Sequence, residues 1–125
     1  MNIASFVRKY NGKILEDAGA VKSNEFICFA RNMKSTMRDI CKNEGAELIN
    51  FNIGHYYVSG FISKNGKYVY FNYDEPRHMP IHLDASDCSF GILIRKAKND
   101  KDFHGESNHF CNIYQFAEML NRLTA

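Results

Sequence analysis

Histidines and cysteines in the second half of the chain have the side chains best suited to catalysis. His104, His109 and Cys111 lie close together, and His82 precedes Cys88 by six residues. A cysteine acts as a nucleophile when a histidine comes within hydrogen-bond reach, and a helix beginning just after Cys111 would lower the pKa of its thiol. A small hydrolase or transferase that uses His104, His109 or Cys111 is therefore one hypothesis.

The same residue types raise the question of a metal site. His78 and His82 are four residues apart, and Asp84, Asp87 and Cys88 follow. Zinc takes such ligands, but the spacings match no zinc template, so we predict neither a metal nor a cofactor. The motifs GxxxxGK[ST], GxGxxG, HExxH and GxSxG are also missing. The sequence therefore favours a protein without enzymatic activity.

A long polar segment, RKAKNDKDFHGESNHF at residues 95–110, offers a site of another kind. Long loops in compact domains are often functional, because the scaffold positions binding groups on them. We predict that this segment binds an anion or a polar partner, and the alternative is a surface turn whose charges keep it soluble. The predicted binding residues in this segment are Arg95, Lys98, Lys101, Asp102, His104, Ser107 and Asn108.

Two aromatic segments, HYYVSGFIS and KYVYFNY, flank Asn65-Gly66 and predict a hairpin with a type I′ turn. That turn pairs Lys64 with Lys67 and places the more apolar face of the hairpin against the helices. The other face combines aromatic rings with hydroxyl and amide groups. Exposed rings on a sheet can stack on nucleic acid bases, whereas the alternative is cross-strand pairing on a partly solvated face. The predicted binding residues of this face are Tyr57, Phe61, Tyr68 and Tyr70.

Apolar residues at helical spacing predict a helix over residues 25–44, with Ser23 or Asn24 as its cap and Gly45 at its exit. Cations form a stripe opposite the apolar side of this helix: Arg31, Lys34, Arg38 and Lys42. Such a stripe can follow a phosphate backbone. The alternative is an ordinary solvated helix face.

The remaining elements complete an α+β domain over residues 1–125. A first helix carries Ile3, Phe6, Val7 and Tyr10 and ends at Asn11-Gly12, a strand alternates over Ile49–Ile53, and FGILIRKA at residues 90–97 forms a fourth strand. Residues 74–89 read as a loop. Asn112 and Gln115 resemble a capping pair for a last helix. We predict an antiparallel four-stranded sheet (a meander) with helices packed on one face, in the order α-α-β-β-β-β-α.

Composition fits a cytoplasmic protein. Hydrophobic residues make up 45% and charged residues 24% of the 125 residues, which is the globular range. The net charge of +2 is too small to predict nucleic acid binding by itself. We expect no membrane span, no signal peptide, and reduced thiols, with Cys28 and Cys41 on the apolar sides of helices.

The pattern R-x-A-K-x-x-K-D-[YF]-x-G-x-S-N resembles a group of small, functionally unassigned proteins carried by phages and other mobile elements of Gram-positive bacteria. The resemblance covers about residues 26–112 and includes a helix before a tyrosine-rich hairpin. It rests on Arg95, Ala97, Lys98, Lys101, Asp102, Phe103, Gly105, Ser107 and Asn108. It implies a binding protein in the bacterial host cell that inhibits a host defence nucleoprotein, as an anti-CRISPR protein does.

A second comparison is with the double-stranded RNA-binding domain, whose element order is α-β-β-β-α. The chain departs from it by residues 74–111, which intervene before the last helix, and by the absence of a basic cluster where that helix begins. The expected partner is therefore a host protein or nucleoprotein complex. Direct binding of RNA or DNA is the alternative, and no membrane is involved.

Overall fold

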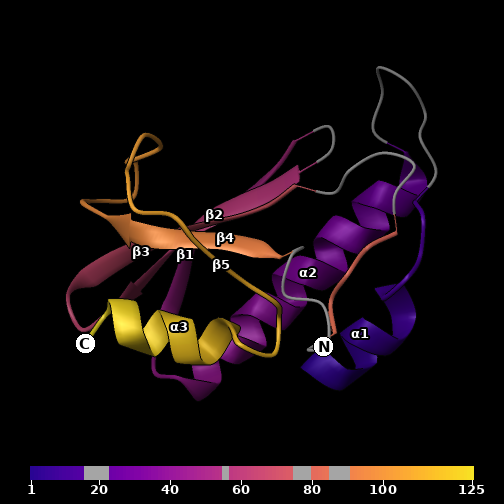
Figure 1. The fold of residues 1–125 in the computed structure, drawn as a ribbon, viewed down its shortest axis with the longest axis horizontal. Helices are drawn as coiled ribbons and strands as arrows, with labels where there is room; N and C mark the ends of the chain where they lie inside the picture. Colours follow the sequence, from indigo (N-terminus) through magenta and orange to yellow (C-terminus); the bar gives the residue numbers. More distant parts are fainter. Residues whose placement is uncertain (16–22, 55–56, 75–79, 85–90) are drawn as a thin grey trace.

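The computed structural model describes residues 1–15, 23–54, 57–74, 80–84 and 91–125, and they form an α+β fold (Figure 1). The sheet has five strands, so the prediction of four was wrong. The additional strand is three residues long and overlaps the end of the polar segment, where no apolar alternation marks it. The elements are α1 (Ile3–Tyr10), α2 (Asn24–Asn43), β1 (Glu47–Ile53), β2 (Tyr57–Lys64), β3 (Lys67–Asp74), β4 (Ile92–Ala97), β5 (His109–Cys111) and α3 (Phe116–Leu123).

The strands follow one another across the sheet in the order β1-β2-β3-β4-β5, and all neighbours are antiparallel. The β2–β3 turn is formed by Asn65 with φ 55° and Gly66 with φ 72°, the two positive values that a type I′ turn requires. The predicted register is confirmed, because Lys64 pairs with Lys67 and Phe61 with Tyr70. Residues 55–56 and 90, at the expected starts of two strands, lie outside the described residues.

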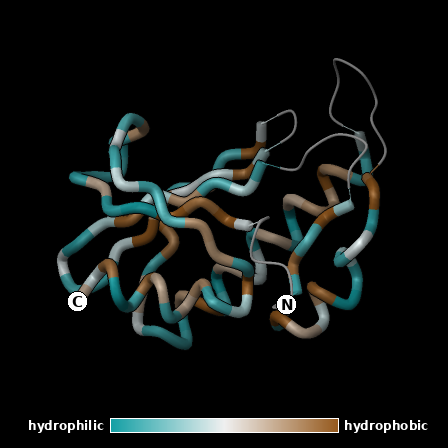
Figure 2. Tube along the Cα trace, viewed as in Figure 1, coloured by the Kyte–Doolittle hydropathy of each residue, from teal (hydrophilic) through white to brown (hydrophobic). Residues whose placement is uncertain are grey.

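The three helices lie on one side of the sheet, and we call the opposite side the outer face (Figure 1). Side chains of α2 such as Phe29 and Met33 are fully buried with Val69 and Phe71 of β3 in one core. The predicted apolar face of the hairpin therefore meets the helices. The segment between β4 and β5 lies on the outer face and is largely hydrophilic (Figure 2).

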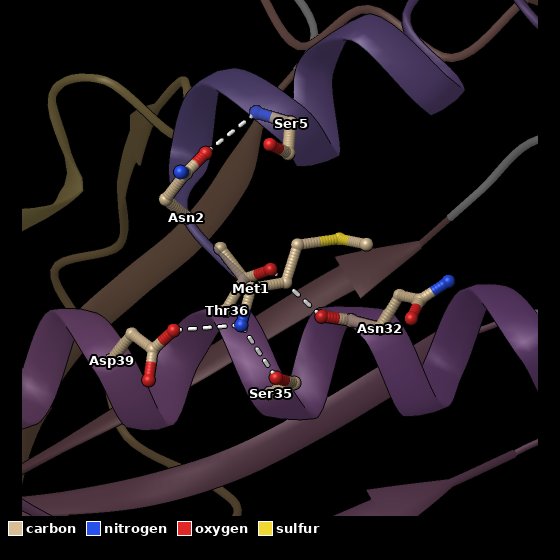
Figure 3. Close-up of polar contacts among 7 residues, drawn as sticks. All are labelled: Met1, Asn2, Ser5, Asn32, Ser35, Thr36 and Asp39. Carbon is tan, nitrogen blue, oxygen red and sulfur yellow. Dashed lines mark hydrogen bonds and ion pairs between the residues drawn. The ribbon is translucent and has the colours of Figure 1, made fainter.

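Caps fix the beginnings of the helices close to their predicted positions. The Ser23 hydroxyl accepts a 3.0 Å hydrogen bond from the Phe26 N–H at the start of α2, and Gly45 follows α2 with φ +67°. Asn2 accepts from the Ser5 N–H at the start of α1 (Figure 3). Asn112 and Gln115 exchange side-chain hydrogen bonds of 2.9 and 3.0 Å with each other's main-chain N–H groups, so the predicted pair forms, but it closes the turn that leads into α3, which itself begins at Phe116.

The segment between β3 and β4 adds side chains to the core that a loop prediction does not anticipate. Ile81 and Leu83 are buried. The Gly12 N–H donates to the Ile81 carbonyl at 2.6 Å, and the Leu83 N–H donates to Asn11 Oδ1 at 2.9 Å. Residues 80–84 thereby close the side of the core next to α1. Cys28, expected on an apolar helix side, is exposed instead.

Candidate binding surface

The polar loop, residues 98–108, folds back over the outer face of the sheet between β4 and β5 (Figure 1). It is held in place by Arg95 of β4, a residue that is only 2% exposed. The guanidinium carbon lies 4.6 Å from the centre of the Tyr70 ring on the neighbouring strand. A buried arginine needs hydrogen-bond acceptors and a counter-charge, so its partners show how the loop is held.

Arg95 finds those partners in the loop and in its own strand. Its Nη2 donates to the Asp102 carbonyl at 2.5 Å, and its Nη1 donates to the Lys96 carbonyl at 3.2 Å. The Asp102 carboxylate lies 3.8 Å from Nη1. Gly105 packs so closely that an added Cβ would lie 2.7 Å from the Arg95 Cζ. Arg95 and Asp102 therefore join the loop to the sheet, rather than facing a partner as the sequence led us to expect.

An aromatic cluster forms a second attachment. The Phe103 ring of the loop lies 5.1 Å from the Phe61 ring and 6.0 Å from the Tyr70 ring, nearly perpendicular to both. Phe61 is fully buried as a result, and Tyr70 is half-buried. The expectation that Phe61 belongs to an open aromatic face was therefore wrong, because the loop covers its ring. Phe103 itself remains 49% exposed.

Short-range hydrogen bonds hold the first half of the loop in one shape. The Lys98 N–H donates to Asp102 Oδ2 at 2.9 Å, and the Lys101 N–H donates to Asn99 Oδ1 at 2.9 Å. The Lys98 N–H lowers the pKa of the Asp102 carboxyl, and the charge of Arg95 acts in the same direction. Asn50 of β1 reaches the Asp100 carbonyl at 3.4 Å. The loop is thus attached to four strands: β1 through Asn50, β2 through Phe61, β3 through Tyr70 and β4 through Arg95.

The side chains left outside form the candidate binding surface. Of the predicted binding residues, those exposed on this loop are Lys98, Lys101, His104, Ser107 and Asn108. Sequence reasoning missed Phe103 and Phe110, which are 49% and 61% exposed. The sequence feature that could have indicated them is an aromatic residue within a run of polar residues. Tyr57 is exposed at the far end of β2, and Tyr68 is half-buried at the hairpin end of β3, so neither belongs to this surface.

The basic stripe of α2 lies on the helix side of the sheet, away from the polar loop (Figure 1). Arg31, Arg38 and Lys42 are exposed, whereas Lys34 is half-buried with its amine 6.0 Å from the centre of the Phe51 ring. Arg31, Lys34, Ser35, Arg38 and Asp39 line a hollow of about 290 Å³. Asp39 and Ser35 both accept 2.7 Å hydrogen bonds from the Met1 amine (Figure 3). The two predicted cationic regions are therefore separate surfaces.

The geometry contradicts the role of Cys111 as a nucleophile. Cys111 is buried in β5 rather than placed at a helix N-terminus, and burial raises the pKa of its thiol to about 12. Cys41 is also buried, and its pKa is raised to about 11. His104 and His109 are exposed. Among the described residues no three histidine, cysteine or carboxylate side chains group around a possible ion, and His78, Asp87 and Cys88 lie outside them.

Comparison with known proteins adds no assignment. No family model matches the chain, and no curated protein or solved structure matches it significantly. In the part of the chain that the structure describes, every helix is too short or too polar to cross a bilayer.

Proposed function

We propose that the protein is a non-enzymatic binding protein whose recognition surface is the polar loop on the outer face. One observation carries this proposal: the loop is anchored from inside by the buried Arg95 while its outward side chains remain uncovered. The long polar connection then serves two purposes, since one side of it packs on the sheet and the other side is available to a partner.

The physical advantage of this arrangement is a small entropic cost of binding. A loop that is already ordered loses little freedom when a partner binds. Partly exposed aromatic rings among polar groups are also typical of the residues that contribute most to interfaces. Phe103 and Phe110 provide such rings, and Lys101, His104 and Asn108 are exposed polar residues close to them in the sequence.

We further propose a host protein or nucleoprotein complex as the partner, in the bacterial cytoplasm. The support is the resemblance of residues 95–108 to proteins of mobile elements, which often block host defences, CRISPR effectors among them. The residues that carry this resemblance have distinct places in the structure: Arg95, Asp102 and Gly105 shape the loop, while Lys101 and Asn108 are exposed. Inhibition of a defence nucleoprotein is the function that we would test first.

The test compares three forms of the tagged protein in capture from bacterial lysate and in inhibition of a purified CRISPR effector. The loop variant is Lys101→Glu with His104→Glu, and both side chains are exposed. The matched control is Arg122→Glu, an exposed charge reversal on α3 on the other side of the sheet. We expect the wild type and the control to share a partner or an inhibitory activity that the loop variant loses. Equal behaviour of all three forms would contradict the proposal.

Direct nucleic acid binding is a second candidate, and the basic stripe of α2 favours it. Within the described residues no carboxylate forms an ion pair with Arg31, Arg38 or Lys42. Uncompensated cations displace counterions from phosphates, so affinity should fall steeply as salt rises. We would measure gel shifts with single- and double-stranded DNA and RNA, using Arg31→Glu with Arg38→Glu as the variant and Arg122→Glu as the control. Absence of a shift at low salt would exclude this candidate.

A further inference from the structure

A hollow of about 350 Å³ lies at the end of the sheet where β3 begins and β4 ends. This volume falls within the range of small-molecule sites. We call it the lysine hollow, because three of its lining residues are lysines. It is lined by Gly66, Lys67, Tyr68, Lys96, Ala97, Lys98 and Leu123. It is distinct from the stripe on α2.

Strand register explains why the three amines meet there. Tyr68 pairs with Ala97, so Lys67 and Lys98 each lie one residue beyond this last pair, on neighbouring strands. Lys96 pairs with Val69, a core residue, so it projects to the helix side of the sheet, where Leu123 of α3 lies. Like charges on adjacent strands repel each other. The arrangement is therefore unfavourable unless something negative compensates it.

The end of α3 does not supply that compensation for all three lysines. Carbonyl groups at a helix C-terminus attract cations, and the Lys67 amine donates to the Ala125 carbonyl. Asn65 donates to the Thr124 carbonyl at 3.2 Å. The amines of Lys96 and Lys98, however, have neither an ion-pair partner nor a hydrogen-bond acceptor in the described part of the chain. Neither amine thus forms a close ion pair, although the charge of Lys98 acts on the Asp102 carboxyl at longer range.

We propose that the lysine hollow binds a phosphate-bearing small molecule of nucleotide size. Lysine amines bind phosphate as point charges, and Lys96 and Lys98 would hold the phosphates. Tyr68 and Leu123 also line the hollow, from the outer side and the helix side of the sheet respectively, and a base could pack against either of them. Charge attracts the phosphates, and the wall of the hollow selects a ligand that also has a flat apolar part.

The test is a titration followed by NMR of the backbone amides at low ionic strength, with ADP, inorganic pyrophosphate and adenosine as probes. We expect ADP and pyrophosphate to shift the amide signals of Gly66, Tyr68 and Ala97, whereas adenosine leaves them unchanged. ADP should bind more tightly than pyrophosphate because of the contacts with its base. If pyrophosphate bound as tightly as ADP, Tyr68 and Leu123 would have no role in binding. If adenosine bound as tightly as ADP, the phosphates would have no role and the proposal would be overturned.

Two single variants and a matched control complete the experiment. Lys96→Gln and Lys98→Gln should each weaken ADP binding about fivefold or more, as expected for loss of one nearby charge in a partly solvated site. Lys9→Gln removes an exposed charge on α1 that does not line the hollow, and it should leave the affinity unchanged. No binding of ADP at millimolar concentration, or an equal effect of all three variants, would contradict the proposal. Lys96 lies outside the polar loop, so the effect of Lys96→Gln is independent of the proposed function, whereas Lys98 belongs to both surfaces.

Discussion

At the scale of single residues, Arg95 is the side chain on which the outer face depends. It is a buried cation on the side of the sheet that no helix covers. Its stack on Tyr70 and its bonds to the loop use the planar guanidinium, which lysine cannot imitate. Removing a partner of Arg95 should therefore destabilise the fold strongly, because a buried charge left unpaired is strongly unfavourable.

The contact between Gly105 and Arg95 gives the first prediction. Gly105→Ala places a Cβ against the Arg95 guanidinium, which is confined by Tyr70 and Asp102. Either the loop backbone or the arginine side chain must therefore shift. We expect the free energy of unfolding to fall by about 1–3 kcal/mol, the usual cost of overpacking. Chemical denaturation would measure it, with Glu106→Ala, an exposed neighbour, as a control that changes stability by less than about 0.5 kcal/mol. An equally small effect of Gly105→Ala would show that the loop does not pack on Arg95.

Asp102 gives a prediction about pH. The Lys98 N–H and the Arg95 charge lower the pKa of this carboxyl below its ordinary value of 3.8. A carboxyl with a lowered pKa in the folded state stabilises the fold above its ordinary pKa, and this contribution is lost as the pH falls through the lowered value. Asp102→Asn should therefore destabilise the protein at pH 7, and the difference from the wild type should shrink below about pH 4. Denaturation curves at several pH values would test this, and a difference that is constant with pH would contradict it.

At the scale of elements, the capping pair before α3 is the clearest agreement between sequence and structure. Asn112 is buried, bonds the Gln115 N–H, and also donates to the Asp84 carbonyl at 3.1 Å. Asn112→Ala should lower the free energy of unfolding by about 1–2 kcal/mol, because a cap and a buried hydrogen bond are both lost. Thermal or chemical denaturation would measure it, with the exposed Arg122→Ala as a nearly neutral control. A neutral Asn112→Ala would show that α3 does not depend on this cap.

Elements with a strong local signal could be predicted from the sequence. The dipeptide Asn65-Gly66 favours a type I′ turn, and this turn fixes the register of β2 and β3. Ser23 and Gly45 mark the two ends of α2. The β5 strand could not be predicted, because its pairing with β4 is a long-range contact and its own three residues show no pattern. The buried positions of Ile81 and Leu83 are likewise set by distant partners near α1.

The candidate site could be predicted only in part, for the same reason. Exposure of Lys98, Lys101 and Asn108 follows from a polar sequence. The inward roles of Arg95 and Asp102 depend on the loop folding back onto the sheet, which local spacing does not encode. The covering of Phe61 by Phe103 joins residues 42 positions apart in the chain, so the sequence indicated an aromatic face but not its cover.

At the scale of the whole molecule, the sheet separates three surfaces that differ in chemistry. The polar loop covers the outer face, the basic stripe lies on α2, and the lysine hollow opens at the end of the sheet near α3. The small net charge of +2 does not indicate these separate surfaces. It counts acidic residues such as Asp39 and Asp102, whose charges are already used in internal ion pairs. A partner of the outer face therefore meets hydrogen-bonding groups and aromatic rings rather than a uniform positive field.

The central claim is that the polar loop is an ordered surface held by Arg95, and amide hydrogen exchange by NMR tests it most directly. In the wild type, the N–H groups of Lys98, Lys101 and Phe103 should exchange at least about tenfold more slowly than in an unstructured peptide, because each donates a hydrogen bond. In Arg95→Lys, protection of these three groups should be lost while the amides of β2 and β3 keep theirs. Loop amides that exchange at unstructured rates in the wild type would contradict the account.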